Sequence, residues 1–140
     1  MANIVVPNAA EQLQLKAILN HTSPQNQVIK LFCNNFSPGP SDTESSFTEA
    51  TGGGYSSKSL TGSSWTIATD GSGNASGSYA IQTWTFTGPL TTNPAIYGYF
   101  VIQTSSGLLL WCQLAPAAVT PTTNGDTFSV TPIVTHRQQP

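Results

Sequence analysis

Three acidic residues that could supply general acid–base chemistry fall within one short stretch, at Asp42, Glu44 and Glu49. A hydrolase needs either a paired acid and base or a nucleophile beside a base. The chain has two histidines, His21 and His136, and contains none of the sequence patterns typical of serine hydrolases or zinc peptidases. Because an acidic cluster without such partners is typical of a solvated loop, we expect no catalytic residues and no enzymatic activity.

Two further patterns could bind metal. Residues 70–74 place oxygen-bearing side chains at alternate positions, as the first half of a calcium loop does. Ala75 and Ile81 then occupy positions where such a loop requires glycine and a bidentate glutamate, so a flexible turn is expected. Cys33 and Cys112 have no cysteine or histidine at the spacing of a zinc site. We expect no metal and no cofactor, and free buried thiols, with a disulfide across a sheet as the alternative outside a reducing compartment.

Aromatic side chains admit two interpretations, as exposed platforms that stack on sugar rings or as fillers of a core. They are Tyr55, Trp65, Tyr79, Trp84, Tyr97, Tyr99 and Trp111. In the stretch 79–87 the residues alternate, with Trp84 and Phe86 on the same face as Ala80 and Gln82. This alternation favours burial for most of the aromatic residues.

The elements that position these side chains are predicted to be mostly strands. A chain of 140 residues is long enough for one domain, and 38% hydrophobic residues are sufficient for a core. Short β-prone runs alternate with turn residues, which predicts an all-β fold, a mainly antiparallel β-sandwich or jelly roll. The expected strands are 28–33, 55–60, 65–69, 79–87, 95–104, 108–114 and 127–135, with a flexible loop at 70–78.

The N-terminal part differs from the rest. Residues 1–7 form an expected extended arm, and residues 8–140 form a single β-sandwich domain that includes one short α-helix at about 9–20. Asn8 is a good N-cap, and Glu11 follows three residues later in the register of a capping box. We expect this helix to cover one end or edge of a sheet.

Charge and hydropathy exclude several classes of function. Only 7% of residues are charged and the net charge is −2, so no face can neutralise a row of phosphates, and we expect no nucleic-acid partner. The longest apolar runs are far shorter than the roughly 20 residues that a membrane helix needs. The first residues lack the features of a signal peptide, which predicts synthesis in a cytoplasm.

Several segments in combination resemble a group of small virion proteins of tailed bacteriophages. The resemblance lies in residues 1–8, 29–36 with Pro38 and Pro40, 41–43, 47–50, Tyr55, Leu60, Trp65, 96–101, Leu110-Trp111, 124–126 and 128–135. It implies a structural protein, specifically a capsid cement or decoration protein on the outside of the head, made in the host cytoplasm. The implied partners are the major capsid protein or another virion protein. The alternative is a tail, fibre or receptor-binding module that recognises host-surface glycans.

The apolar arm residues Ile4, Val5 and Val6 are the candidate interface. In cement proteins a terminal arm commonly reaches a neighbouring subunit, so the resemblance implies an intersubunit contact here. The alternative is a strand placed on a sheet edge within the same chain. Low charge and exposed sheet edges predict a homo-oligomer, a dimer or a trimer.

Overall fold

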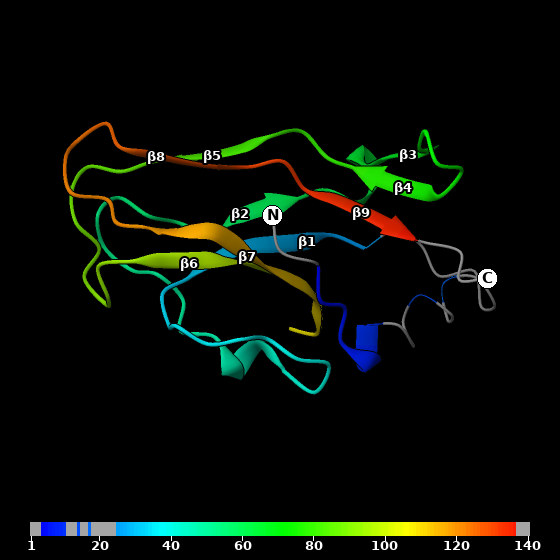
Figure 1. Ribbon diagram of the computed structural model, residues 1–140, viewed down its shortest axis with the longest axis horizontal. Coiled ribbons are helices and arrows are strands. Elements are labelled where there is room, and N and C mark those ends of the chain that lie inside the picture. Colours follow the sequence, from blue (N-terminus) through cyan, green and yellow to red (C-terminus); the bar gives the residue numbers. More distant parts are fainter. Residues whose placement is uncertain (1–3, 11–13, 15–16, 18–24, 137–140) are drawn as a thin grey trace.

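The protein is an all-β, antiparallel structure built in two layers (Figure 1). The computed structural model describes residues 4–10, 14, 17 and 25–136. The first layer is a four-stranded sheet in the order β2 (Lys58–Leu60), β1 (Gln27–Phe32), β6 (Ile96–Gln103) and β7 (Leu109–Val119). The fold class expected from the sequence is confirmed.

The second layer consists of two ladders placed end to end. One is the pair β5 (Gln82–Thr85) and β8 (Thr127–Val130), and the other has the order β3 (Thr66–Thr69), β4 (Ala75–Ser78) and β9 (Ile133–His136). Between them the Tyr79 N–H donates to the Pro132 carbonyl oxygen at 3.0 Å. Short 3-10 helices, η1 (Glu44–Ser46) and η2 (Gly62–Ser64), lie in the connections.

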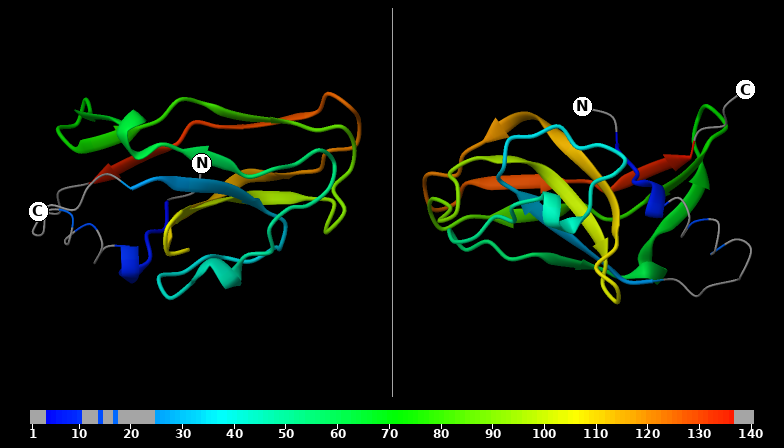
Figure 2. Two further views of the ribbon diagram at one scale, coloured as in Figure 1. Left: turned by 180° about the vertical axis from the view of Figure 1, so that it is seen from behind. Right: turned by 90° about the horizontal axis from the view of Figure 1, so that it is seen from below.

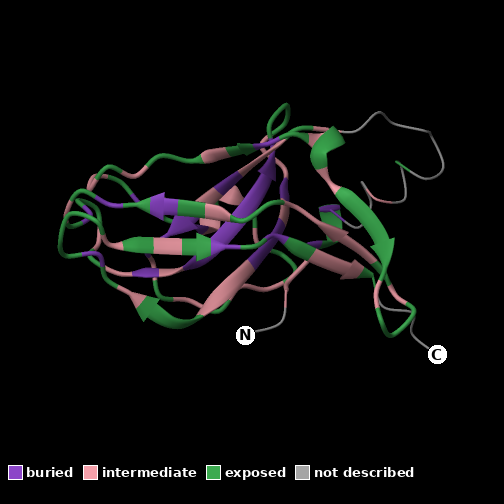
Figure 3. Ribbon diagram, turned by 90° about the horizontal axis from the view of Figure 1, so that it is seen from above, coloured by how far each residue is buried: buried purple, intermediate pink, exposed green. Residues whose placement is uncertain are grey.

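The main core lies between the two layers, as the concentration of buried residues in Figure 3 shows. On β5 the alternation predicted from the sequence is confirmed, because Trp84 is buried while Thr83 and Thr85 are exposed. Phe86 follows the strand and is completely buried. These side chains pack with residues of the first layer, among them Ile29, Leu31, Tyr99 and Val101.

A second core lies on the outer face of the first layer. Phe47 stacks on Phe100, with ring centroids 4.5 Å apart, and contacts Phe32 edge-on at 5.0 Å. Phe36 adds an edge-on contact to Phe47 at 5.1 Å. Phe36 and Phe47 belong to the connection between β1 and β2, which lies under the sheet in Figure 2. β6 is therefore covered on both faces, which explains why its residues 98–103 are all buried.

Two sequence predictions about strands are wrong. The single final strand 127–135 is divided into β8 and β9, because Pro132 has no N–H to donate to a ladder. The expected loop at 70–78 contains the strand β4. Its sequence, Ala-Ser-Gly-Ser, has a weak preference for strands, and pairing with both β3 and β9 overrides that preference.

The expected helix at 9–20 falls largely outside the described residues. Residues 8–10, 14 and 17 are described, and all of them are helical. The helical conformation begins at Asn8. This is one residue earlier than predicted, because Asn8 was expected to be the N-cap that precedes the first helical residue.

Candidate interaction surface

Two of the three acidic residues, Glu44 and Glu49, pair with a cation on the first layer, whereas Asp42 accepts the Gly39 N–H at 2.7 Å. Lys30 Nζ lies 2.9 Å from Glu44 Oε1 and 3.1 Å from Glu49 Oε2. The Tyr55 hydroxyl donates to Glu49 Oε1 at 3.0 Å and accepts the Leu31 N–H at 3.1 Å. Burial raises the pKa of Tyr55 well above its ordinary value. The two glutamates thus hold the connection after β1 against the sheet, which corrects the expectation of a simple solvated loop.

The ion pairs of Lys30 lead to a prediction about alkaline pH. Burial disfavours the charged form of Lys30, but hydrogen bonds to Glu44 and Glu49 outweigh this effect and raise its pKa above 10.5. Because the pKa of Lys30 is raised in the folded state, the protonated side chain contributes to the free energy of unfolding below pH 10.5. This contribution is lost as the pH rises through the folded-state pKa. We expect Lys30→Met to lower the free energy of unfolding by about 1 kcal/mol at neutral pH, with a smaller difference from wild type above the folded-state pKa.

Urea unfolding of both proteins at pH about 8 and about 12 measures this difference. A difference that stays constant over this range would show that Lys30 contributes through packing of its alkyl chain rather than through its charge.

Residues 70–74, which match the first half of a calcium-binding loop, form a turn in which the Asp70 carboxylate accepts hydrogen bonds from the backbone. Asp70 Oδ1 accepts the N–H groups of Ser72 and Asn74, both at 2.9 Å, and the Asn74 side chain donates to Oδ2 at 3.2 Å. Within the described residues no group of three or more potential metal ligands comes together.

The two cysteines are free and buried. Cys112 belongs to the outer core with Phe32 and Phe100. Cys33 follows Phe32 in an extended segment, so its side chain points to the opposite face of the sheet, the side on which Leu31 lies. Burial raises the pKa of both thiols, that of Cys112 to about 12.

Most aromatic residues serve the core, as their alternation predicted. Trp84, Tyr99 and Trp111 are buried, and Tyr55, Trp65, Tyr79 and Tyr97 are half-buried. Burial raises the pKa of Tyr99 to about 12, and its hydroxyl donates to Gln113 Oε1 at 3.0 Å. Most of these aromatic residues therefore pack against one of the two cores.

The arm residues contact their own chain. The Val5 N–H donates to the Cys112 carbonyl oxygen and the Cys112 N–H to that of Val5, both at 3.1 Å. Ile4 and Val6 pack against the core between the layers, whereas Val5 packs against the outer core. The arm therefore lies along the edge strand β7 of its own chain, as the alternative interpretation of the sequence predicted. An intersubunit role for the arm remains a prediction.

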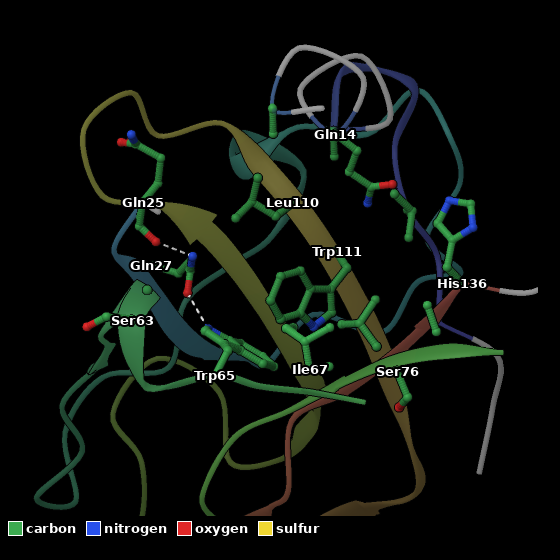
Figure 4. Close-up of a pocket in the computed structure, with 17 residues that line it drawn as sticks. Gln14, Gln25, Gln27, Ser63, Trp65, Ile67, Ser76, Leu110, Trp111 and His136 are labelled. Carbon is green, nitrogen blue, oxygen red and sulfur yellow. Dashed lines mark hydrogen bonds between the residues drawn. The ribbon is translucent and has the colours of Figure 1, made fainter. Parts of the chain in front are cut away.

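A pocket of about 700 Å³ opens where the two layers separate at one end of the molecule (Figure 4). The pocket is lined by Trp111 and Leu110 of the first layer and by Ile67 and Val134 of the second, together with Trp65. The Trp65 indole N–H donates to Gln27 Oε1 at 2.8 Å, and the Gln27 side-chain amide donates to the Gln25 carbonyl oxygen. No Asp, Glu, Lys or Arg is among the described residues that line it.

The large apolar side chains that are exposed lie in or next to the strands of the second layer. Among the described residues, the large hydrophobic side chains that are exposed are Ile67 at 73%, Ile81 at 61% and Ile133 at 45%. Ile67 belongs to β3 and Ile133 to β9, while Ile81 immediately precedes β5. The five strands of this layer contain no Asp, Glu, Lys or Arg. Sequence reasoning missed this surface, because an isoleucine in a β-prone run is ordinarily assigned to the core.

These features define an antiparallel β-sandwich whose second layer is uncharged and partly apolar. No helix among the described residues is long and apolar enough to span a membrane. Comparisons of the chain with protein-family models, with curated proteins and with solved structures find no match.

Proposed function

We propose that this protein is a non-enzymatic structural protein of a tailed-bacteriophage virion, a cement protein that binds the outside of the head and stabilises it. The observation that carries the proposal is the distribution of chemical groups in the described part of the chain. Glu44, Glu49 and Asp70, which could have supplied chemistry, are engaged in holding the fold together. The exposed isoleucines Ile67, Ile81 and Ile133 instead lie in or next to the uncharged strands of the second layer, as suits a protein that acts through its surfaces.

The proposed mechanism is mass action. A protein that binds only the assembled shell stabilises that state by RT ln(1 + [L]/Kd), about 2.7 kcal/mol per site at a hundredfold excess over Kd. Repetition over the many equivalent sites of a shell multiplies this effect. The proposed partner is the major capsid protein or another virion protein, and the protein is proposed to bind as a homo-oligomer. Its resemblance to small phage virion proteins supports the same assignment.

Deletion of residues 2–7 tests the proposed role of the arm. We expect a folded β domain that binds heads weakly, because Ile4, Val5 and Val6 are lost as contacts. Cosedimentation with purified heads measures binding, circular dichroism checks the fold, and the melting temperature of the heads measures stabilisation. A truncated protein that remains oligomeric and binds as tightly as the intact chain would show that the arm serves only its own domain.

The location of the labelled protein on particles tests the function itself. Label distributed over the head in electron micrographs would support the cement protein. Label confined to the tail would refute it and favour the alternative, a receptor-binding module for host glycans.

A further inference from the structure

We infer that β3 is the strand through which two copies of this chain associate, by antiparallel pairing of β3 with β3 across a two-fold axis. The inference deepens the homo-oligomer of the proposed function. It concerns the isolated protein and is tested without phage particles, so the failure of one proposal can be distinguished from the failure of the other.

The first observation is that β3 is an open edge. It lies at one end of the molecule, at the margin of the second layer (Figure 1). All four of its residues are exposed, and Ile67 is 73% exposed. Within the described part of the chain its backbone pairs with β4 alone, which leaves the opposite row of N–H and C=O groups without a protein partner.

The second observation is that β3 lacks the features that normally prevent edge pairing. Edge strands are usually protected by charged residues, prolines, bulges or covering segments. β2 carries Lys58, and β7 carries Pro116 and is bridged by Val5. The sequence of β3 is Thr-Ile-Ala-Thr, and its register with β4 is continuous over all four residues.

The chemistry of this edge fits a second copy of the same strand. A strand that pairs antiparallel with itself generates a two-fold axis, the symmetry of the commonest oligomers. Because β3 is uncharged, two copies can approach without opposing like charges. Pairing would join the two three-stranded ladders into one continuous sheet of six strands, three from each chain.

A four-residue strand alone would form a small interface, since stable ones bury about 1,200–2,000 Å². The open pocket adds apolar area directly beside the edge, because Ile67 of β3 lines it and Trp65, which immediately precedes β3, lines it as well. The Ile67 side chain extends across Gly77, where an added Cβ would lie 3.1 Å from Ile67 Cδ1. A partner chain paired with β3 would therefore lie beside both Ile67 and the pocket.

Sedimentation of the intact chain at concentrations up to about 1 mM tests the inference. Ile67→Lys would place two lysines at the shared edge, and we expect at least about tenfold weaker dimerisation. Ile81→Lys is the matched control, since it replaces another exposed isoleucine outside β3, and we expect it to leave dimerisation unchanged. Circular dichroism of both variants confirms that each is folded.

A cysteine cross-link provides an independent measurement. Pairing centred on residue 68 places the two residue-68 side chains opposite each other. In Ala68→Cys, mild oxidation should then link two chains covalently, because Cys33 and Cys112 are buried. Ala80→Cys, at an exposed position outside β3, should cross-link much less. A chain that is monomeric throughout the concentration range would overturn the inference. So would a dimer that Ile67→Lys leaves intact, or a trimer, because self-antiparallel pairing closes at two chains.

Discussion

Replacement of Trp84 by alanine is expected to lower the free energy of unfolding by about 3–5 kcal/mol. Trp84 is 4% exposed, and its indole N–H donates to the Ser56 carbonyl oxygen at 2.8 Å. Its ring contacts Phe128, with centroids 6.3 Å apart, and Lys58 Nζ lies 5.6 Å from its centroid. The substitution would create a cavity between the layers and leave the Ser56 carbonyl without this donor. The urea midpoint measures the loss.

Thr83→Ala is the matched control on the same strand. Thr83 is exposed on the outer face, where its hydroxyl lies 2.8 Å from Ser129 Oγ, so we expect a change below about 0.5 kcal/mol. Equal losses in the free energy of unfolding for Trp84→Ala and Thr83→Ala would mean that the side of β5 carrying Trp84 does not face the core.

Replacement of Gly98 by alanine is expected to destabilise the protein by about 3 kcal/mol, the upper end for overpacking a core. Gly98 lies in the middle of the first layer, where the register between β6 and β7 shifts. An added Cβ would overlap the Gln113 carbonyl oxygen, and it would lie 2.8 Å from Phe32 Cε1 and 3.0 Å from Leu114 Cα. Two of these three obstacles are backbone atoms, which cannot rotate away as a side chain can.

Gly71→Ala is the control for this second substitution. No atom lies within 4 Å of an added Cβ at Gly71, so we expect little change in stability. Thermal unfolding of both variants measures the difference. A Gly98→Ala protein as stable as wild type would mean that β6 and β7 are farther apart than described.

Effects of this size at Trp84 and Gly98 would leave the proposed dimer edge untouched. Trp84 lies in the main core and Gly98 within β6 of the first layer, whereas β3 lies at the margin of the second layer. Stability and association can therefore be measured separately in this protein, one through the core and the other through Ile67.

The fold class could be predicted from the sequence because strand formation leaves a local signal. The alternation around Trp84 and Phe86 predicts one buried and one exposed face, and the turn residues mark the ends of most strands. β4 left no such signal, since Ala75, Ser76, Gly77 and Ser78 become a strand only when β3 and β9 pair with them. The boundary at Pro132 was visible in the sequence, but its consequence for the ladders was not predicted.

The candidate surface could not be predicted in the same way. Ile67 and Trp84 are both apolar residues in β-prone runs, yet one is 73% exposed and the other 4%. Sequence separation also conceals the partnership of Lys30 with Glu49 and the bridge between Val5 and Cys112. The sequence by itself determined that strands form, that the aromatic residues are mostly buried and that charge is scarce. Only the tertiary structure decided that β3 became an open edge strand, because the exposure of a strand depends on the order in which distant strands pair.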